Sequence, residues 1–169
     1  TFFVTSTLSA GPGTLREAIE KAAANGNRDP DFIYFNITRA REYVIYITPN
    51  NPLPPLTSNI TIDATTQPSA IMGVSDARVG VALEGNYNGS GPLYLFDCAE
   101  ASNIKIFGLF LKGNVPARPT NFSAIHLLGS SNVQIGEPDK GNVISGWSKA
   151  VYVEYDTRFV SSNVTISNN

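Results

Sequence analysis

Several residue types that would point to other classes of protein are scarce in this chain of 169 residues. It has one cysteine, one histidine and one tryptophan, and charged residues make up only 15% of it. A single cysteine excludes an internal disulfide and a cysteine-based zinc site, so we expect Cys98 to be a small buried residue. The formal charge of −2 is not the basic footprint that nucleic-acid-binding proteins carry. We therefore expect no nucleic-acid partner.

Long apolar runs are absent as well. No stretch approaches the roughly 18 apolar residues of a membrane span, so the sequence predicts no transmembrane segment. The chain is instead rich in Gly, Asn, Ser and Thr, which is typical of a β protein with many turns. We interpret residues 1–169 as a single domain, with a cap and first strands at 1–57 and repeating coils at 58–169. Because Thr1 is not a native start, we also interpret the chain as a piece of a longer protein.

One five-residue pattern, Ser-Asn-aliphatic-polar-Ile, occurs four times. The copies begin at Ser58, Ser102, Ser131 and Ser162, and in the last three the final Ile recurs at spacings of 29 and 31 residues. Other strand-like runs fall between the copies, so each period holds about three short strands separated by Gly, Asn and Ser turns. A four-stranded propeller blade would need about 40 to 45 residues. The repeat therefore predicts an all-β fold, a parallel β-helix with three strands in each coil.

The residues of the repeat fit this arrangement. Successive side chains of a strand face opposite ways, so the aliphatic residue and the Ile of each copy can share one core. Asn and Gly are expected at the corners, where they supply left-handed backbone; the Gly-Asn pairs at 85–86, 113–114 and 141–142 recur at spacings of 28 residues, and Asn59 and Asn163 also lie at the corner of the repeat. Asn side chains stacked from coil to coil can hydrogen-bond along the axis.

The chain has one convincing helix, near its beginning. Residues 14–17 have the capping-box spacing that starts a helix, and the pattern predicts that the helix runs to about Ala24. An amphipathic helix at this place would cover the open end of the stacked core. At the other end, we expect further coils or another protein to cover the last strand.

Several segments resemble a known family. Residues 11–19, 60–68 and 141–146 look like the opening and inner coils of right-handed parallel β-helix (pectin-lyase-like) domains in large secreted bacterial surface and adhesin-like proteins, including those of Bacteroidetes. The resemblance implies a right-handed coil and an extracellular, secreted or cell-surface location. It leaves the function open, because this fold carries lyases, hydrolases and inert stalks alike.

Enzymes of this fold need catalytic groups that the sequence does not display. Pectate-lyase-like members resemble one another in an Asp cluster that holds calcium, and polygalacturonase-like members in adjacent Asp residues near a Gly-His-Gly. Neither pattern occurs here. Glu137 and Asp139 are expected to lie in a solvated turn. Aligning Leu93, Ile125 and Val151 places a single carboxylate, Glu154, in its column. We therefore assign no catalytic residue, no metal ligand and no cofactor.

The same alignment produces one suggestive column. It places the rings of Tyr94, His126 and Tyr152 on one outer face, with Phe110 and Trp147 as further exposed aromatic candidates. Rings in a row can hold the apolar faces of a sugar polymer, but they can equally form a cross-strand ladder that only stabilises the sheet. No hydrogen-bond partner for His126 is evident, so we do not expect it to act as a catalytic base.

The sequence thus predicts an extracellular module with a structural, adhesive or glycan-binding role, whose partner is a polysaccharide or a cell-surface glycan. Two alternatives stay open. One is a polysaccharide lyase or glycoside hydrolase with its site elsewhere in the coils. The other is a component or passenger of a bacterial secretion or gliding assembly.

Overall fold

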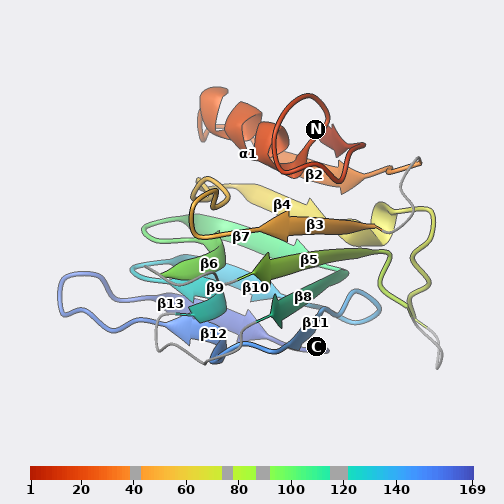
Figure 1. Ribbon diagram of the computed structural model, residues 1–169. Helices are drawn as coiled ribbons and strands as arrows, with labels where there is room; N and C mark the ends of the chain where they lie inside the picture. Colours follow the sequence, from red (N-terminus) through yellow and green to blue (C-terminus); the bar gives the residue numbers. More distant parts are fainter. Residues whose placement is uncertain (39–42, 74–77, 87–91, 115–121) are drawn as a thin grey trace.

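The computed structural model describes residues 1–38, 43–73, 78–86, 92–114 and 122–169. Within these ranges the chain winds into a β-solenoid of about 5 turns, and every pair of neighbouring strands in its three sheets is parallel (Figure 1). The predicted all-β parallel solenoid is therefore confirmed.

The largest sheet has six strands and passes through the stack from one end to the other. Three copies of the five-residue repeat lie within strands of this sheet, and the first copy begins two residues before its strand. Val133 pairs with Ile104 on one side and with Val164 on the other, which is the register that the repeat predicts. In spatial order the strands are β1 (Phe2–Val4), β2 (Asp31–Phe35), β4 (Ile60–Asp63), β7 (Ser102–Phe107), β10 (Ser131–Ile135) and β13 (Ser162–Ile166).

Two smaller sheets complete each coil. The chain leaves the six-stranded sheet, enters a four-stranded sheet and then a three-stranded sheet before it returns. The four-stranded sheet contains β11 (Val143–Ser145), β8 (Leu109–Asn114), β5 (Val81–Asn86) and β3 (Val44–Ile47). The three-stranded sheet contains β12 (Lys149–Val153), β9 (Phe122–Leu127) and β6 (Leu93–Asp97).

The last Ile of the repeat forms a column in the core. Ile62, Ile106 and Ile135 pair in register and are fully buried. At the same position of the last strand, Ile166 is 50% exposed. Burying an Ile side chain contributes about 1.5–3 kcal/mol, so this column stabilises the inner coils far more than the last one.

A ladder of stacked asparagines, as predicted for the corners, lies on the outside of this sheet, whereas the Gly-Asn pairs at 85–86, 113–114 and 141–142 do not have the left-handed backbone that was predicted for them. Asn59, Asn103, Asn132 and Asn163 all have left-handed backbone, with φ between 51° and 64°. The side-chain amide of each donates to the carbonyl oxygen of the one before, at distances of 2.7, 3.1 and 2.6 Å. Asparagine tolerates this backbone better than most residues, so one residue type serves both the corner and the contact between coils.

A second pair of asparagines, of which Asn142 is buried and Asn169 exposed, lies at the corner that follows the six-stranded sheet. Asn142 accepts a hydrogen bond from the Leu109 N–H at 3.1 Å and donates to the Ile106 carbonyl at 3.0 Å. One coil further, Asn169 accepts from the Asn142 N–H at 3.0 Å and donates to the Ile135 carbonyl at 2.8 Å. Ile106 and Ile135 pair in register, so the two asparagines satisfy equivalent backbone groups in successive coils.

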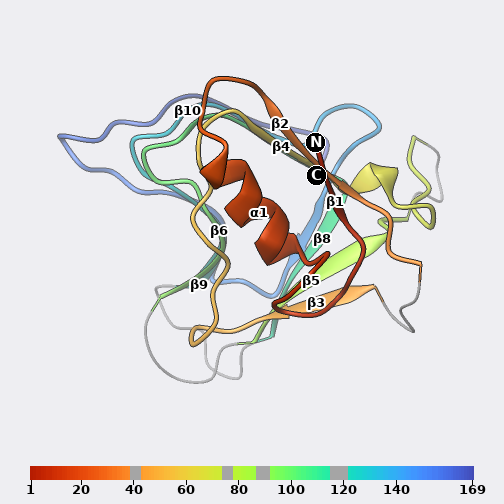
Figure 2. The ribbon, with the colours of Figure 1, turned by 90° about the horizontal axis from the view of Figure 1, so that it is seen from above.

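Helix α1 (Leu15–Ala24) lies across the N-terminal end of the stack (Figure 1). Seen along the axis, it covers the space that the three sheets enclose (Figure 2). The Thr14 side chain accepts from the Glu17 N–H at 3.2 Å, and the Glu17 carboxylate accepts from the Gly13 N–H at 2.7 Å. The buried face of the helix consists of Leu15, Ala18, Ile19 and Ala22.

In the described ranges, no helix has the length and apolar character that crossing a membrane requires. Cys98 is buried in the core, as predicted, and burial raises the pKa of its thiol.

Candidate functional site

The outer face of the three-stranded sheet brings together three of the predicted site residues. The rings of Tyr94 and His126 are stacked, with centroids 4.2 Å apart and planes 18° from parallel. The ring of Tyr152 lies on the other side of His126, at 5.6 Å and tilted by 35°. The predicted column of rings thus exists, and the rings contact one another.

The register that produces this column differs from the predicted alignment. Val151 pairs with Ile125 as expected, but Ile125 pairs with Phe96 and not with Leu93. The alignment of β6 was therefore wrong by three residues, and Tyr94 reaches the His126 ring from a position that pairs with Ser123.

The true register gives His126 the partners that the sequence did not reveal. Asp97 pairs directly with His126, and its Oδ1 lies 2.9 Å from Nδ1 of the imidazole. Glu154, which directly follows β12, places its Oε2 2.8 Å from Nε2. The prediction that His126 has no evident partner, and that the column holds one carboxylate, was thus wrong. We call Tyr94, Asp97, His126, Tyr152 and Glu154 the His126 cluster.

The imidazole is enclosed by this cluster. His126 is only 5% exposed, with tyrosine rings beside it and a carboxylate at each nitrogen. Burial alone would lower the pKa of His126, but the hydrogen bonds and charges of Asp97 and Glu154 outweigh it, so the pKa is raised above its ordinary value. Both nitrogens can donate only in the protonated ring. We therefore describe His126 as an imidazolium that links two carboxylates.

Charged side chains also lie close to the two tyrosine rings of the cluster. Burial, followed by the charges of Glu154 and Asp97, raises the pKa of Tyr94. The ammonium group of Lys149 lies over the ring of Tyr152, 3.4 Å from its centroid, which is a cation–π contact. Tyr94 and Tyr152 are both half-buried.

The arrangement leaves carboxylate oxygens for an external partner. The side chains of Asp97 and Glu154 are 33% and 39% exposed. Asp97 Oδ1 also accepts from the Ala99 N–H at 3.2 Å. In the described part of the chain, Oδ2 of Asp97 and Oε1 of Glu154 accept no hydrogen bond, whereas both nitrogens of His126 are occupied. The cluster can therefore accept hydrogen bonds from a ligand, but its imidazole is not placed to abstract a proton.

The other two predicted aromatic residues lie apart from the cluster. Phe110 is on β8, in the four-stranded sheet, and pairs with Ala82 and Val143. Trp147 packs its ring against Phe122 at 4.1 Å, and its Nε1 donates to the Leu111 carbonyl at 3.0 Å. Trp147 thus serves the packing between two sheets.

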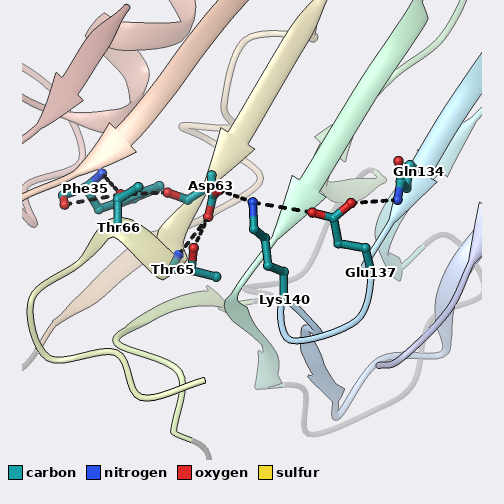
Figure 3. A network of polar contacts seen from close by, with 7 residues as sticks. All are labelled: Phe35, Asp63, Thr65, Thr66, Gln134, Glu137 and Lys140. Atoms are coloured by element: carbon teal, nitrogen blue, oxygen red, sulfur yellow. Dashed lines mark hydrogen bonds and ion pairs between the residues drawn. The ribbon is translucent and has the colours of Figure 1, made fainter. Parts of the chain in front are cut away.

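The carboxylates near residue 137 form a separate network (Figure 3). The ammonium of Lys140 lies 3.2 Å from Asp63 Oδ2 and 3.3 Å from Glu137 Oε1. Asp139 belongs to the same turn but not to this network. No group of three or more His, Cys, Asp or Glu side chains in the described ranges could hold a metal ion. A lysine therefore neutralises these carboxylates.

Comparison with known proteins gave no further assignment. No protein-family model, curated protein or solved structure matches this chain. The fold that the resemblance to secreted bacterial β-helix domains implies is present as a parallel solenoid, while membership of that family stays an expectation.

One signal in the sequence could have located Asp97 beside His126. Asp97 lies seven residues before Ile104, and His126 lies seven residues before Val133. Because Ile104 and Val133 belong to the repeat and pair in register, counting back from the repeat aligns the two residues. Counting back from the repeat in this way does not locate Glu154, because the connection from β12 to β13 is longer than those from β6 to β7 and from β9 to β10.

Proposed function

We propose that this protein is an extracellular, non-catalytic β-solenoid module that binds a glycan at a cell surface through the His126 cluster. The extracellular location is supported by the resemblance of the sequence to secreted bacterial proteins. The choice of ligand follows from the chemistry of the cluster.

One observation carries the proposal: Asp97 and Glu154 are held by the same buried imidazole, beside tyrosine rings, on an outer face of the solenoid. Ligand sites combine apolar or aromatic surface with a few polar groups whose positions are fixed. Here the imidazolium fixes both carboxylates, so they would lose little freedom when a ligand binds.

The chemistry of these groups suits sugar hydroxyls. An ionised carboxylate only accepts hydrogen bonds, and bonds to charged acceptors are about twice as strong as those between neutral groups. Tyr94 and Tyr152 add aromatic surface for the apolar face of a sugar ring. The charge of the cluster, two carboxylates and one imidazolium, favours a neutral sugar over an anionic one.

A glycan-array screen of the folded protein tests the proposal, with Asp97→Asn and Tyr152→Ala measured beside the wild type. Each change should weaken binding of the same glycan several-fold. Tyr46→Ala is the matched control, because Tyr46 is 50% exposed but lies on the four-stranded sheet. Unfolding curves must show that each variant is folded. The proposal fails if no glycan binds, or if Tyr46→Ala weakens binding as much as Tyr152→Ala.

The carboxylates also favour a second candidate function, glycoside hydrolysis. This chemistry uses two carboxyl groups about 5 to 10 Å apart, and Asp97 and Glu154 flank one imidazole from the coils before and after it. A reducing-sugar assay on the glycans that bind would detect it. Product formation that Asp97→Asn and Glu154→Gln both abolish would replace the binding module with an enzyme.

A further inference from the structure

The outer face of the six-stranded sheet carries a line of side chains that the His126 cluster does not use. We propose that this line is a second binding surface, on which an extended glycan chain lies parallel to the solenoid axis. The inference rests on the proposed function and deepens it, because it predicts a polymeric ligand. We call Phe32, Thr61, Lys105, Gln134 and Thr165 the outer line.

The register of the sheet makes the line straight. Phe32 pairs with Thr61, Thr61 with Lys105, Lys105 with Gln134, and Gln134 with Thr165. All five side chains are exposed or half-buried, and they alternate with residues of the core. Neighbouring strands lie about 4.8 Å apart, so the line presents one side chain at each regular step across five coils.

Part of this line is a groove. Its volume is about 200 Å³, and it crosses β7, β10 and β13. No acidic side chain lines the groove, and Lys105 forms no ion pair with the described residues. The lining consists of Asn103, Lys105, Asn132, Val133, Gln134, Asn163 and Thr165.

The lining retains hydrogen-bonding capacity for hydroxyl groups. Asn132 donates one N–H to Asn103 and accepts one from Asn163. A side-chain amide has two N–H groups and two lone pairs, so each inner amide of the ladder keeps one of each. The Lys105 ammonium and the Thr165 hydroxyl lie beside them. Sugar hydroxyls both donate and accept, and this mixed surface matches them.

A chain of polar contacts fixes Gln134, the fourth residue of the outer line (Figure 3). Gln134 Nε2 donates to Glu137 Oε2 at 3.1 Å, and Glu137 in turn is bound by Lys140. Lys140 is anchored at Asp63, which also accepts from the Thr65 backbone N–H at 3.0 Å. The amide of Gln134 is therefore oriented before any ligand arrives, with its carbonyl oxygen directed away from Glu137.

The N-terminal end of the line is aromatic. Phe3 is 58% and Phe32 is 36% exposed, and both rings lie about 6 Å from that of Tyr34, at 6.1 and 6.0 Å. Aromatic rings on a flat outer face provide surface for the apolar face of a sugar. The sheet thus offers rings at one end and fixed polar groups further along, which is the combination expected of a ligand site.

The position of the line also argues against a peptide ligand. Peptides commonly bind a sheet by adding a strand to its free edge, but β4, β7 and β10 lie inside the sheet and their backbone groups pair with neighbours on both sides. Only side chains are available on this face. A polymer recognised through hydroxyl groups and ring faces fits that restriction.

The test uses the folded protein and soluble xylan, mannan, laminarin and alginate, with short and long oligosaccharides of whichever polysaccharide binds. We expect the long oligosaccharides to bind at least tenfold more tightly than the short ones. The double variant Phe32→Ala/Lys105→Ala should remove this length dependence. The double variant Tyr46→Ala/Lys21→Ala, which removes the same kinds of side chain elsewhere, should retain it.

The outcomes separate this inference from the proposed function. If binding does not depend on length and is weakened only by Asp97→Asn or Tyr152→Ala, the second surface is refuted while the proposed function stands. If none of the four polysaccharides binds, the outer line is refuted, and the proposed function fails with it only if no glycan of the array binds either. Length dependence that both double variants retain also overturns the outer line. Thermal unfolding of the variants excludes loss of the fold as the cause.

Discussion

The six-stranded and three-stranded sheets of this solenoid differ in how similar the paired residues of neighbouring coils are. In four strands of the six-stranded sheet, one repeat supplies a core residue and a corner residue, and these two positions carry nearly the same residues from coil to coil. In the three-stranded sheet, the paired residues Asp97, His126 and Tyr152 are chemically different. Uniform columns stabilise the stack, whereas mixed columns create a local site.

The largest expected effect sharpens the first half of this comparison. Ile106→Ala removes a fully buried side chain from the uniform column and should lower the free energy of unfolding by about 2–5 kcal/mol. Ile166→Ala makes the same change at the same repeat position, where the side chain is 50% exposed, and should cost less than about 1 kcal/mol. Urea unfolding of the two variants measures both. Equal losses would contradict the burial gradient along the stack.

The asparagine ladder allows a finer test of the same sheet. Asn132→Ala removes two side-chain hydrogen bonds and leaves a residue with φ of 54° that disfavours left-handed backbone. We expect a loss of about 2–3 kcal/mol in unfolding free energy. Asn132→Gly removes the same bonds but tolerates the backbone, so it should lose about 1 kcal/mol. If glycine costs as much as alanine, backbone conformation is not why asparagine stands there.

His126→Gln addresses the mixed column. A glutamine keeps some hydrogen-bonding capacity but not the positive charge, so Asp97 and Glu154 would face each other without compensation. Because both carboxylates are partly exposed, solvent should limit the loss to about 2 kcal/mol. Chemical denaturation measures it. The double variant Asp97→Asn/His126→Gln should recover part of the loss; no recovery would mean that the charges are not the cause.

The same contrast explains how much could be predicted from the sequence. The repeat established the fold and the register of the six-stranded sheet, because identical residues such as the four corner asparagines mark equivalent positions. In the three-stranded sheet, the similar patterns around Tyr94 and His126 suggested an alignment that was wrong by three residues. Apolar alternation alone does not determine register, whereas the equal seven-residue distances from Asp97 to Ile104 and from His126 to Val133 do align the two strands.

The remaining site residues escaped prediction for a further physical reason. Glu154 reaches His126 from beyond the end of β12, so neither pairing nor periodicity places it there. Lys140 and Asp63 are 77 residues apart in sequence and meet because a turn folds over the face of the sheet. Contacts of this kind depend on the paths of turns, and the sequence pattern of the strands does not contain them.

The smallest expected effect is a pH dependence that only the mixed column should produce. His126 is the one histidine of the chain, so its ring resonances report its pKa by NMR without ambiguity. Its pKa should lie above the ordinary value of about 6.5, because the hydrogen bonds and charges of Asp97 and Glu154 outweigh burial. A raised pKa means that the folded state holds this proton more tightly than the unfolded state. The stabilisation is therefore complete below about pH 6.5 and is lost as the pH rises through the folded-state pKa.

The tyrosine and the cysteine close to the ring titrate well above this pH range. The pKa of Tyr94 is raised and that of Cys98 lies far above its ordinary value, so both stay protonated near neutral pH. Unfolding free energies measured from pH 6 upward should fall for the wild type and stay nearly level for His126→Gln. The N-terminal amine is present in both proteins and therefore does not account for a difference between them. Parallel curves for the two proteins, or a His126 pKa at or below about 6.5, would show that the carboxylates do not hold an imidazolium. The mixed column would then be a ring ladder without the fixed acceptors on which glycan binding depends.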